Sequence, residues 1–335
     1  MVGVRARPAF VAAVVAIAAA LGIGIGLGGS APAHGRGGLG AAAASLPKST
    51  TVLGFTDWQH IVDRYDLSEA SQRDLVTRSV LVDDPSGVKR WLGVGLHAVA
   101  WEAYGQWPAG EAAVLRLKGS MPSAARLRKS GYREKDGVWN ATGRLAADEP
   151  IYASVARLPR DGVIVIGARP GAVGAVRDVI RGRLASMGED RSVADVVQGL
   201  SGVQTALIQT SRLGCVATKV AVEPERARQA AAAEARFGRL VPYSVLGRGL
   251  RDDQSDTQRF AVAMTFGSAV TAAKQSGIRA ALSHGPFLGR SGDISEVLRI
   301  RSSRSDGPVA LLSYDHPADS EYLMTGHGPL MPASC

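Results

Sequence analysis

Five side chains near the end of the chain are of the types that bind metals or transfer protons. Asp315 and His316 are adjacent, Asp319 and Glu321 follow shortly, and His327 comes next. Carboxylates and imidazoles ligate metal ions and act as general acids and bases. Their spacing matches no fixed motif such as H-E-x-x-H. We therefore interpret them as part of a solvated turn around a His-Pro pair, and we predict neither a metal site nor a catalytic group here.

A second set of side chains could support nucleophilic hydrolysis. Ser283 and His284 are neighbours, and a Gly-Arg-Ser-Gly run at 289–292 looks like a loop. The chain has no G-x-S-x-G sequence, so a Ser-His-Asp triad would have to be assembled from distant residues. An envelope hydrolase is therefore the alternative function, and it requires His284, His316 and His327 to lie close together in a cleft.

Three glycines enter a predicted helix after a predicted strand, as in dinucleotide-binding proteins. Gly167, Gly171 and Gly174 are spaced G-x-x-x-G-x-x-G, and Pro170 interrupts the turn. The dinucleotide fingerprint is G-x-G-x-x-G, followed by an acid about 20 residues later. The spacing favours close packing between the helix and the sheet, and we predict no cofactor.

All five tryptophans lie in the first half of the chain. Trp101, Tyr104 and Trp107 are spaced i, i+3, i+6 and would share one face of a helix. Such a face can bind sugars, lipids or a protein partner. The other interpretation is that these rings pack against a sheet in the core. We keep the three residues as the candidate binding surface.

The chain contains two cysteines, Cys215 and Cys335. In an exported protein an even number of cysteines permits a disulfide, because the compartment is oxidising. A Cys215–Cys335 bridge would hold the C-terminal residue against the second half. The alternative is two free thiols, one of them in a buried strand.

The N-terminal segment determines the compartment in which these residues are expected to act. Phe10 to Gly29 carry no charge, and Arg5 and Arg7 precede them. A basic start, an apolar run and an Ala-x-Ala site ending at Ala33 are typical of a secretory signal. Alternatively, an apolar run of about 20 residues remains as a membrane anchor. Both interpretations place the rest of the chain outside the cytoplasm, either anchored or secreted after cleavage near Ala33.

Charge and composition limit the classes of partner. The formal net charge is +9 and the apolar fraction is 46% of 335 residues. A basic exported protein suits anionic wall polymers or lipid head groups. Its arginines are spread along the sequence rather than clustered, so we predict no nucleic-acid partner.

We predict four regions. Residues 1–33 form a signal peptide or signal-anchor helix, and 34–50 form a flexible linker because they are rich in Gly, Ala and Ser. Residues 51–186 and 187–335 form a first and a second α+β domain. In the first, we predict a helix from a capping box at Thr56, strands over 113–118 and 132–141, a helix over 121–129 capped at Ser120, a hairpin over 151–167 and a helix from Pro170. In the second, we predict a strand over 205–210.

The second half repeats features of the first. Ala261-Val262 stand 148 residues after Ala113-Val114, and Gly267-Ser268 and Ala272-Ala273 match Gly119-Ser120 and Ala124-Ala125 at the same offset. After a deletion of two residues, the match continues between Ser276-Gly277-Ile278-Arg279 and Ser130-Gly131-Tyr132-Arg133. Two later matches are Asp306-Gly307 with Asp161-Gly162, and Pro317 with Pro170. We infer a diverged duplication. The expected fold is two tandem ferredoxin-like α/β sandwiches, each an antiparallel-rich sheet with helices on one face.

Parts of the first half are similar to a group of exported, membrane-anchored actinobacterial proteins. The shared runs are WEAYGQWPAGEAAVLRLKG, LRKSGYREKDGVW and ASVARLPRDGVIVIG. The resemblance covers roughly residues 50 to 185. It implies an exported α+β protein and carries over no activity and no site residue.

From these observations we expect an extracytoplasmic, non-enzymatic envelope protein that binds an unknown partner. An envelope protein, a lipid or a wall polymer is the expected partner, and the membrane is a further one if the segment from Phe10 to Gly29 is retained.

Overall fold

The computed structural model describes residues 38–72, 74–143, 150–210, 231–232, 235–236, 238–252, 257–284, 293–317, 324 and 331–333. The predicted N-terminal apolar helix, both cysteines and His327 lie outside these residues. Within them, no helix combines the length and the apolar character needed to cross a membrane.

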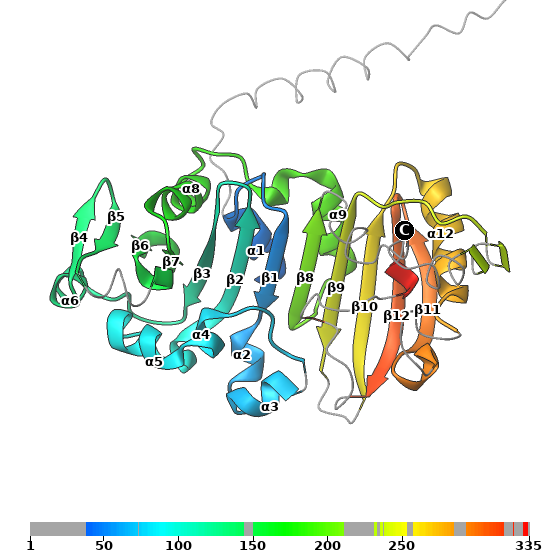
Figure 1. Ribbon diagram of the computed structural model, residues 1–335, viewed down its shortest axis with the longest axis horizontal. Helices are drawn as coiled ribbons and strands as arrows, with labels where there is room; N and C mark the ends of the chain where they lie inside the picture. Colours follow the sequence, from blue (N-terminus) through cyan, green and yellow to red (C-terminus); the bar gives the residue numbers. More distant parts are fainter. Residues whose placement is uncertain are drawn as a thin grey trace, which may run out of the picture. The chain divides into compact units, whose positions relative to one another are not determined.

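One sheet runs through both halves of the chain (Figure 1). Its twelve strands are arranged in the order β11-β12-β10-β9-β8-β1-β2-β3-β7-β6-β5-β4, and every pair is antiparallel. The strands are β1 Val52–Thr56, β2 Val99–Trp107, β3 Gly110–Leu117, β4 Tyr132–Lys135, β5 Val138–Ala141, β6 Ser154–Leu158, β7 Val163–Gly167, β8 Thr205–Thr210, β9 Val245–Arg251, β10 Thr257–Thr265, β11 Arg299–Asp306 and β12 Val309–Pro317. The two halves meet where β1 pairs with β8.

Helices cover both faces of the sheet. On the first, which we call the α9 face, lie α1 Gly38–Ser45, α8 Pro170–Ile180 and α9 Arg191–Gly199, and their apolar side chains form one core with the strands. The second, the α12 face, carries α2 Trp58–Ile61, α3 Leu67–Gln72, α4 Val80–Asp83, α5 Pro85–Gly87, α6 Ala124–Lys129 and α12 Ala269–Ala281. Short helical turns join these elements: η1 Val88–Leu92, η2 Leu96–Ala98, η3 Pro150–Tyr152, η4 Pro159–Asp161, η5 Met187–Glu189, η7 Ile294–Glu296 and η8 Met331–Ala333.

The expectation of a mixed α+β protein with an antiparallel-rich sheet is confirmed, but the expectation of helices on one face is wrong. The sequence Val163–Gly167 is apolar throughout and every residue is buried. A strand without polar alternation is typical of a sheet covered on both sides. The continuous apolar run in β7 was therefore the available sign of a second helical layer.

The predicted flexible linker over 34–50 is wrong for residues 38–50. Residues 38–45 form α1, and Ala42 and Leu46 are fully buried. Small alanines let α1 approach the sheet closely, and Leu46 packs against Gly105, which has no side chain to exclude it. A run of Ala and Gly has the composition of a linker, but it can form a buried helix where it packs against a sheet.

The predicted division at 186/187 does not separate two compact units. Residues 36 to 335 form one unit, because β1 pairs through all five of its residues with β8. The two halves nevertheless have the same strand order: β1-β2-β3-β7-β6 corresponds to β8-β9-β10-β12-β11, outward from that junction. The first half carries the additional hairpin β4–β5 at its outer edge.

Several predicted elements form close to their expected positions, and others are displaced. Strands β3, β6, β7 and β8 and helices α6 and α8 form close to their expected positions. The predicted capping box at Thr56 does not form, since Asp57 is the N-cap of α2 and makes no side-chain cap hydrogen bond. Ser268 caps α12, but α6 is capped by Ser123 rather than by Ser120. Residues 276–279 lie inside α12, whereas 130–133 lead from α6 into β4, so that match reflects no shared structure.

Candidate functional site

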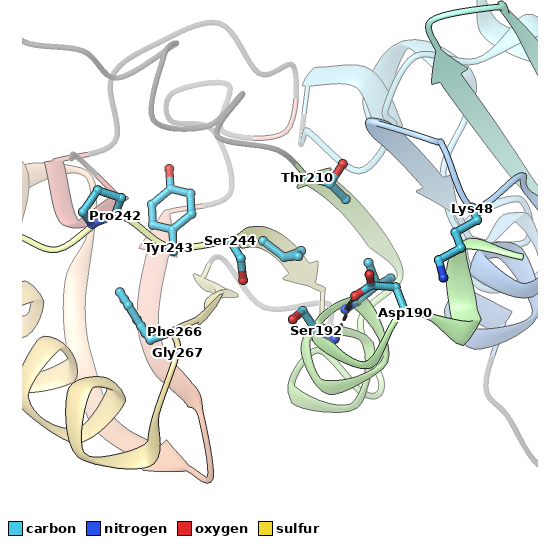
Figure 2. Close-up of a pocket in the computed structure, with 11 residues that line it drawn as sticks. Lys48, Asp190, Ser192, Thr210, Pro242, Tyr243, Ser244, Phe266 and Gly267 are labelled. Atoms are coloured by element: carbon cyan, nitrogen blue, oxygen red, sulfur yellow. Dashed lines mark hydrogen bonds between the residues drawn. The ribbon is translucent and has the colours of Figure 1, made fainter.

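A cleft of about 510 Å³ opens at one end of the sheet, close to the junction of the two halves. Its walls come from segments far apart in the sequence: Lys48, Asp190, Ser192, Val193, Thr210, Pro242, Tyr243, Ser244, Val245, Phe266 and Gly267. Figure 2 shows Lys48 and Asp190 on one side, Tyr243 and Phe266 on the other, and Ser192 and Ser244 between them. The cleft therefore requires both halves of the chain to be assembled.

The first wall is held by backbone and capping hydrogen bonds. Asp190 is the N-cap of α9, and its Oδ1 accepts from the amides of Ser192 at 2.9 Å and Val193 at 3.2 Å. The Lys48 amide donates to the Ala185 carbonyl at 3.0 Å, which fixes the backbone of Lys48 beside the start of α9. A carboxylate at a helix N-terminus is favoured by the free amides and by the helix dipole.

The opposite wall is built at the ends of β9 and β10. Ser244 Oγ lies 2.8 Å from Thr265 Oγ1, which also accepts from the Val245 amide at 3.2 Å. Tyr243 is buried, and its hydroxyl donates to the Ala333 carbonyl at 2.9 Å. These bonds make this wall rigid and leave an aromatic floor of Tyr243 and Phe266 beside hydroxyl groups.

The described side chains of the cleft can form hydrogen bonds and one ion pair with a ligand. Within the part of the chain that the structure describes, its lining offers hydroxyls, one ammonium group and one carboxylate already occupied as a helix cap. Among the described residues that line it, none is a histidine or cysteine that could activate a hydroxyl as a nucleophile. Across the described residues, no group of three His, Cys, Asp or Glu side chains is placed to hold a metal ion.

A second cleft, of about 530 Å³, lies at the same end of the sheet and includes Trp107, Gln106, Glu111 and Arg169. Glu111 accepts from the Tyr104 hydroxyl and, at 3.1 Å, from Gln106 Nε2. Burial raises the pKa of Glu111, but these hydrogen bonds and nearby arginines outweigh it and lower the pKa overall. Burial and the bond to Glu111 raise the pKa of Tyr104 above its usual value. This carboxylate therefore stays ionised and already has partners.

The predicted aromatic face does not exist as a helical face. Residues 99–107 form strand β2, so successive side chains point to opposite sides of the sheet. Trp101 and Trp107 pack on the α9 face, and Tyr104 packs in the core of the α12 face. Spacing of i, i+3, i+6 places residues together only in a helix. Trp107 is 7% exposed and Tyr104 is 4% exposed, which agrees with the core interpretation.

The histidines and acids singled out in the second half occupy different environments. His316 is 1% exposed, and its Nδ1 lies 3.1 Å from the Val297 carbonyl oxygen. His284 is exposed beside residues 300–303 of β11, in another hollow. Asp315 pairs with Arg301 at 3.3 Å. Among the described residues, no cleft brings these groups together; Asp319, Glu321 and His327 lie outside those residues.

Gly167, Gly171 and Gly174 have different roles. A Cβ at Gly167 would lie 3.1 Å from both the Glu111 carbonyl oxygen and Val173 Cγ2. Gly171 and Gly174 face open space. Gly167 is thus required by close packing of α8 on the sheet, as the spacing indicated.

Among the described carboxyl groups of the first half, Glu102 has the most perturbed pKa, and sequence reasoning did not single it out. It is 1% exposed and accepts from Trp58 Nε1 at 3.1 Å, Ser79 Oγ at 2.5 Å and the Val80 amide at 2.7 Å. Burial raises the pKa of Glu102 to about 7, despite these three donors. Ser79 also caps α4. Glu102 therefore fastens the start of α4 to the sheet. The sequence signal for this contact was a single acid among the mostly apolar residues of β2.

No family model matches the chain, and no curated protein matches it. A solved structure titled "Structure of crystal form IV of TP0453" matches with a TM-score of 0.44 and 10% sequence identity. That match covers 83% of this chain and 93% of the other chain. It supports no statement about function.

Proposed function

We propose that this protein is an extracytoplasmic, non-enzymatic binding protein of the cell envelope. The cleft beside Lys48 carries the proposal. It presents hydroxyl groups, an ammonium group and an aromatic floor, the mixture of polar and apolar groups that recognises small polar molecules. Saccharide or peptide units of a wall polymer have the hydroxyls, amides and carboxylates that would fit these groups. A lipid or an envelope protein is the other partner class.

Location rests on the N-terminal sequence. The proposal is that Phe10 to Gly29 either anchor the protein in the membrane or are removed by cleavage near Ala33. A reporter fused after Cys335 should be active outside the cytoplasm, and mass spectrometry should find either His34 or an intact anchor at the N-terminus. An active cytoplasmic reporter contradicts export.

Binding can be tested with wall fragments and matched lysine variants. The full chain in neutral detergent should bind muropeptide or oligosaccharide fragments in isothermal titration calorimetry. Lys48→Ala should weaken that binding about 5- to 30-fold, because a charge-assisted hydrogen bond contributes about 1–2 kcal/mol. Lys118→Ala removes the same charge from an exposed position far from the cleft and should bind like the wild type. Equal weakening in both variants would show that the cleft is not the binding site.

We also propose that the two halves arose by duplication of one ferredoxin-like unit. Three correspondences support it. The strand orders agree outward from the β1–β8 junction. The hairpins β6–β7 and β11–β12 turn at Gly162 and Gly307, with φ of 59° and 52°. Gly105 on β2 and Gly249 on β9, the second strand of each half, each lie beneath apolar side chains that pack on the α9 face.

A further inference from the structure

Arginines form a row across the outer strands of the second half, on the α9 face. Arg251 of β9 is paired in register with Arg259 of β10, Arg259 with Asp315 of β12, and Asp315 with Arg299 of β11. Residues paired in this way point to the same face, with Cα atoms about 4.5–5.5 Å apart. One line perpendicular to the strands therefore carries three guanidinium groups and one carboxylate.

Two more arginines extend the row along the edge strand. A bulge between Ile300 and Ser302 adds Arg301, which reaches Asp315 at 3.3 Å. Arg304 is paired in register with Leu311, which packs in the core of the α9 face. We call the five residues Arg251, Arg259, Arg299, Arg301 and Arg304 the arginine row. All five are exposed.

The arginine row is not neutralised by the described part of the chain. Its acidic neighbours on this face among the described residues are Asp315, which already pairs with Arg301, and Asp306, two residues after Arg304 on the same strand. Five arginines against these two acids leave an excess of positive charge. Arg251 donates to the Gly202 carbonyl at 2.9 Å. Like charges directly opposite on neighbouring strands are destabilising, so Arg251 and Arg259 oppose folding unless an anion lies between or above them. A row of unbalanced guanidinium groups is complementary to a ligand with several negative charges.

Helix α9 limits the shape of that ligand. It packs on the same face, where Val196 lies over Gly247, four residues before Arg251 on β9. That separation is about 13 Å along the strand, and a helix with its side chains is about 10 Å thick. The arginine row therefore lies beside a raised helix. A flat bilayer surface would meet α9 first, whereas a narrow chain can lie next to the helix and cross the strands.

We propose that the arginine row binds a linear polyanion, of the class of phosphate-bearing envelope polymers, in an extended conformation across β9, β10, β12 and β11. Planar guanidinium groups form bidentate hydrogen bonds with phosphate oxygens. A strand spacing of about 4.8 Å presents these groups at intervals that successive anionic groups of a flexible polymer can meet. This surface is separate from the cleft at Lys48, so a polyanion and a ligand of the cleft could bind independently.

The test uses the full chain in neutral detergent and a short fluorescent inorganic polyphosphate as the probe. Fluorescence anisotropy should detect binding whose affinity falls steeply as salt is added, because counterions are released. The triple variant Arg259→Gln, Arg299→Gln, Arg304→Gln should weaken binding about tenfold or more. The slope of log affinity against log salt concentration should also become less negative by about 2, because each lost phosphate contact contributes about 0.7 to that slope.

Arg133→Gln, Arg160→Gln and Arg181→Gln together form the matched control. They remove the same charge from exposed positions of the first half and its last helix, and they should leave binding close to that of the wild type. Equal weakening of polyphosphate binding in both triple variants would show that only the net charge of the protein matters, and it would overturn the proposal. Lys48→Ala should not affect polyphosphate binding, which separates this surface from the cleft.

Hydrogen exchange tests the choice of a polymer over a membrane. The full chain is placed in nanodiscs of phosphatidylcholine with and without phosphatidylglycerol. The amides of β11 and β12 should exchange equally in both, and more slowly once polyphosphate is added. Slower exchange caused by phosphatidylglycerol alone, or tighter binding of a single-stranded oligonucleotide than of polyphosphate, would show that the polymer assignment is wrong.

Discussion

The two halves of the sheet share a strand order but bury opposite charges. In the first half, the carboxyl of Glu102 is enclosed and accepts three hydrogen bonds. In the second, the guanidinium of Arg279 is fully buried and donates to the carbonyls of Pro332 and Val241. Each group fastens a segment outside the sheet: Glu102 holds α4, and Arg279 holds η8 and the chain before β9. The two halves thus share a strand order but hold their surrounding segments with unrelated polar contacts.

The two edges of the sheet differ in the same way. Edge strand β4 carries Arg133, Glu134 and Lys135, two basic residues and one acid, whereas β11 carries three arginines, Asp306 and a bulge. Charges and bulges on an edge oppose pairing with another sheet. Both edges are protected in this way, and the three arginines of β11 also extend the arginine row that we propose as an anion-binding surface.

The largest stability effect is expected from removing the buried guanidinium. Arg279→Ala leaves two buried carbonyls without a donor and opens a cavity between Tyr243 and Phe266. We expect the free energy of unfolding to fall by about 3–5 kcal/mol, measured by urea denaturation. Lys274→Ala, on the exposed side of α12, should change it by less than about 0.5 kcal/mol. A loss below about 1 kcal/mol in Arg279→Ala would mean that η8 is not held this way.

In the first half, Glu102 should make the free energy of unfolding depend on pH. The pKa of Glu102 is raised from 4.5 to about 7 in the folded protein, so the folded state binds this proton more tightly. Its stabilising contribution is complete below about pH 4.5 and is lost as pH rises through about 7. The loss is on the order of 3 kcal/mol. Glu102→Gln should flatten the dependence of unfolding free energy on pH in this window, and the exposed control Glu134→Gln should not. An unchanged slope in Glu102→Gln would contradict the assignment.

Matched glycine substitutions test whether the halves are equivalent in packing. A Cβ at Gly105 would lie 2.7 Å from Leu46, and one at Gly249 would lie 2.7 Å from Val203. Gly105→Val and Gly249→Val should therefore each cost about 1–3 kcal/mol through overpacking. Gly171→Ala, at an open position, serves as the control. Thermal unfolding that shows a large effect in only one half would weaken the correspondence between the halves.

The smallest effect, with an unusual sign, is expected in the arginine row. Arg259→Thr removes the like charge opposite Arg251 and introduces a residue that favours strands. The free energy of unfolding should rise by about 0.2–1 kcal/mol, while polyphosphate binding weakens. Arg133→Thr on β4 provides the comparison, because Arg133 faces no like charge in register. A fall in stability for Arg259→Thr would show that the row already has a stabilising partner within the chain.

Local patterns in the sequence predicted most of the strands but not their arrangement. The hairpin over 151–167 and strand β8 have clear turn and alternation signals, and both form as expected. The aromatic run ending at Trp107 was interpreted as a helix because large residues at i, i+3, i+6 satisfy that period by coincidence. In β2 the neighbouring small residues Ala103 and Gly105 mark close approach of another layer, which periodicity alone does not measure.

The candidate sites depend on contacts that no local pattern contains. Lys48 and Ser244 belong to one cleft because β1 joins the halves. The arginines were described as spread along the sequence, yet registry brings Arg251, Arg259 and Arg299 into one line. The run Arg-Ile-Arg-Ser-Ser-Arg in β11 was the one sequence signal for this surface. Arg251 and Arg259 lie on β9 and β10, tens of residues earlier in the chain, so only strand pairing completes the row.

The position of β1 also determines when the sheet can be completed during synthesis. Thr56 pairs with Glu102 on one side and with Thr205 on the other. Seven strands, β1 to β7, can therefore assemble while β8 has not yet been made. Until then the outer edge of β1, with the sequence VLGFT, presents unpaired backbone groups and apolar side chains, the combination most prone to wrong pairing. The order of synthesis makes this internal strand a temporary edge, so a chaperone that binds extended apolar segments would act at β1 before the second half appears.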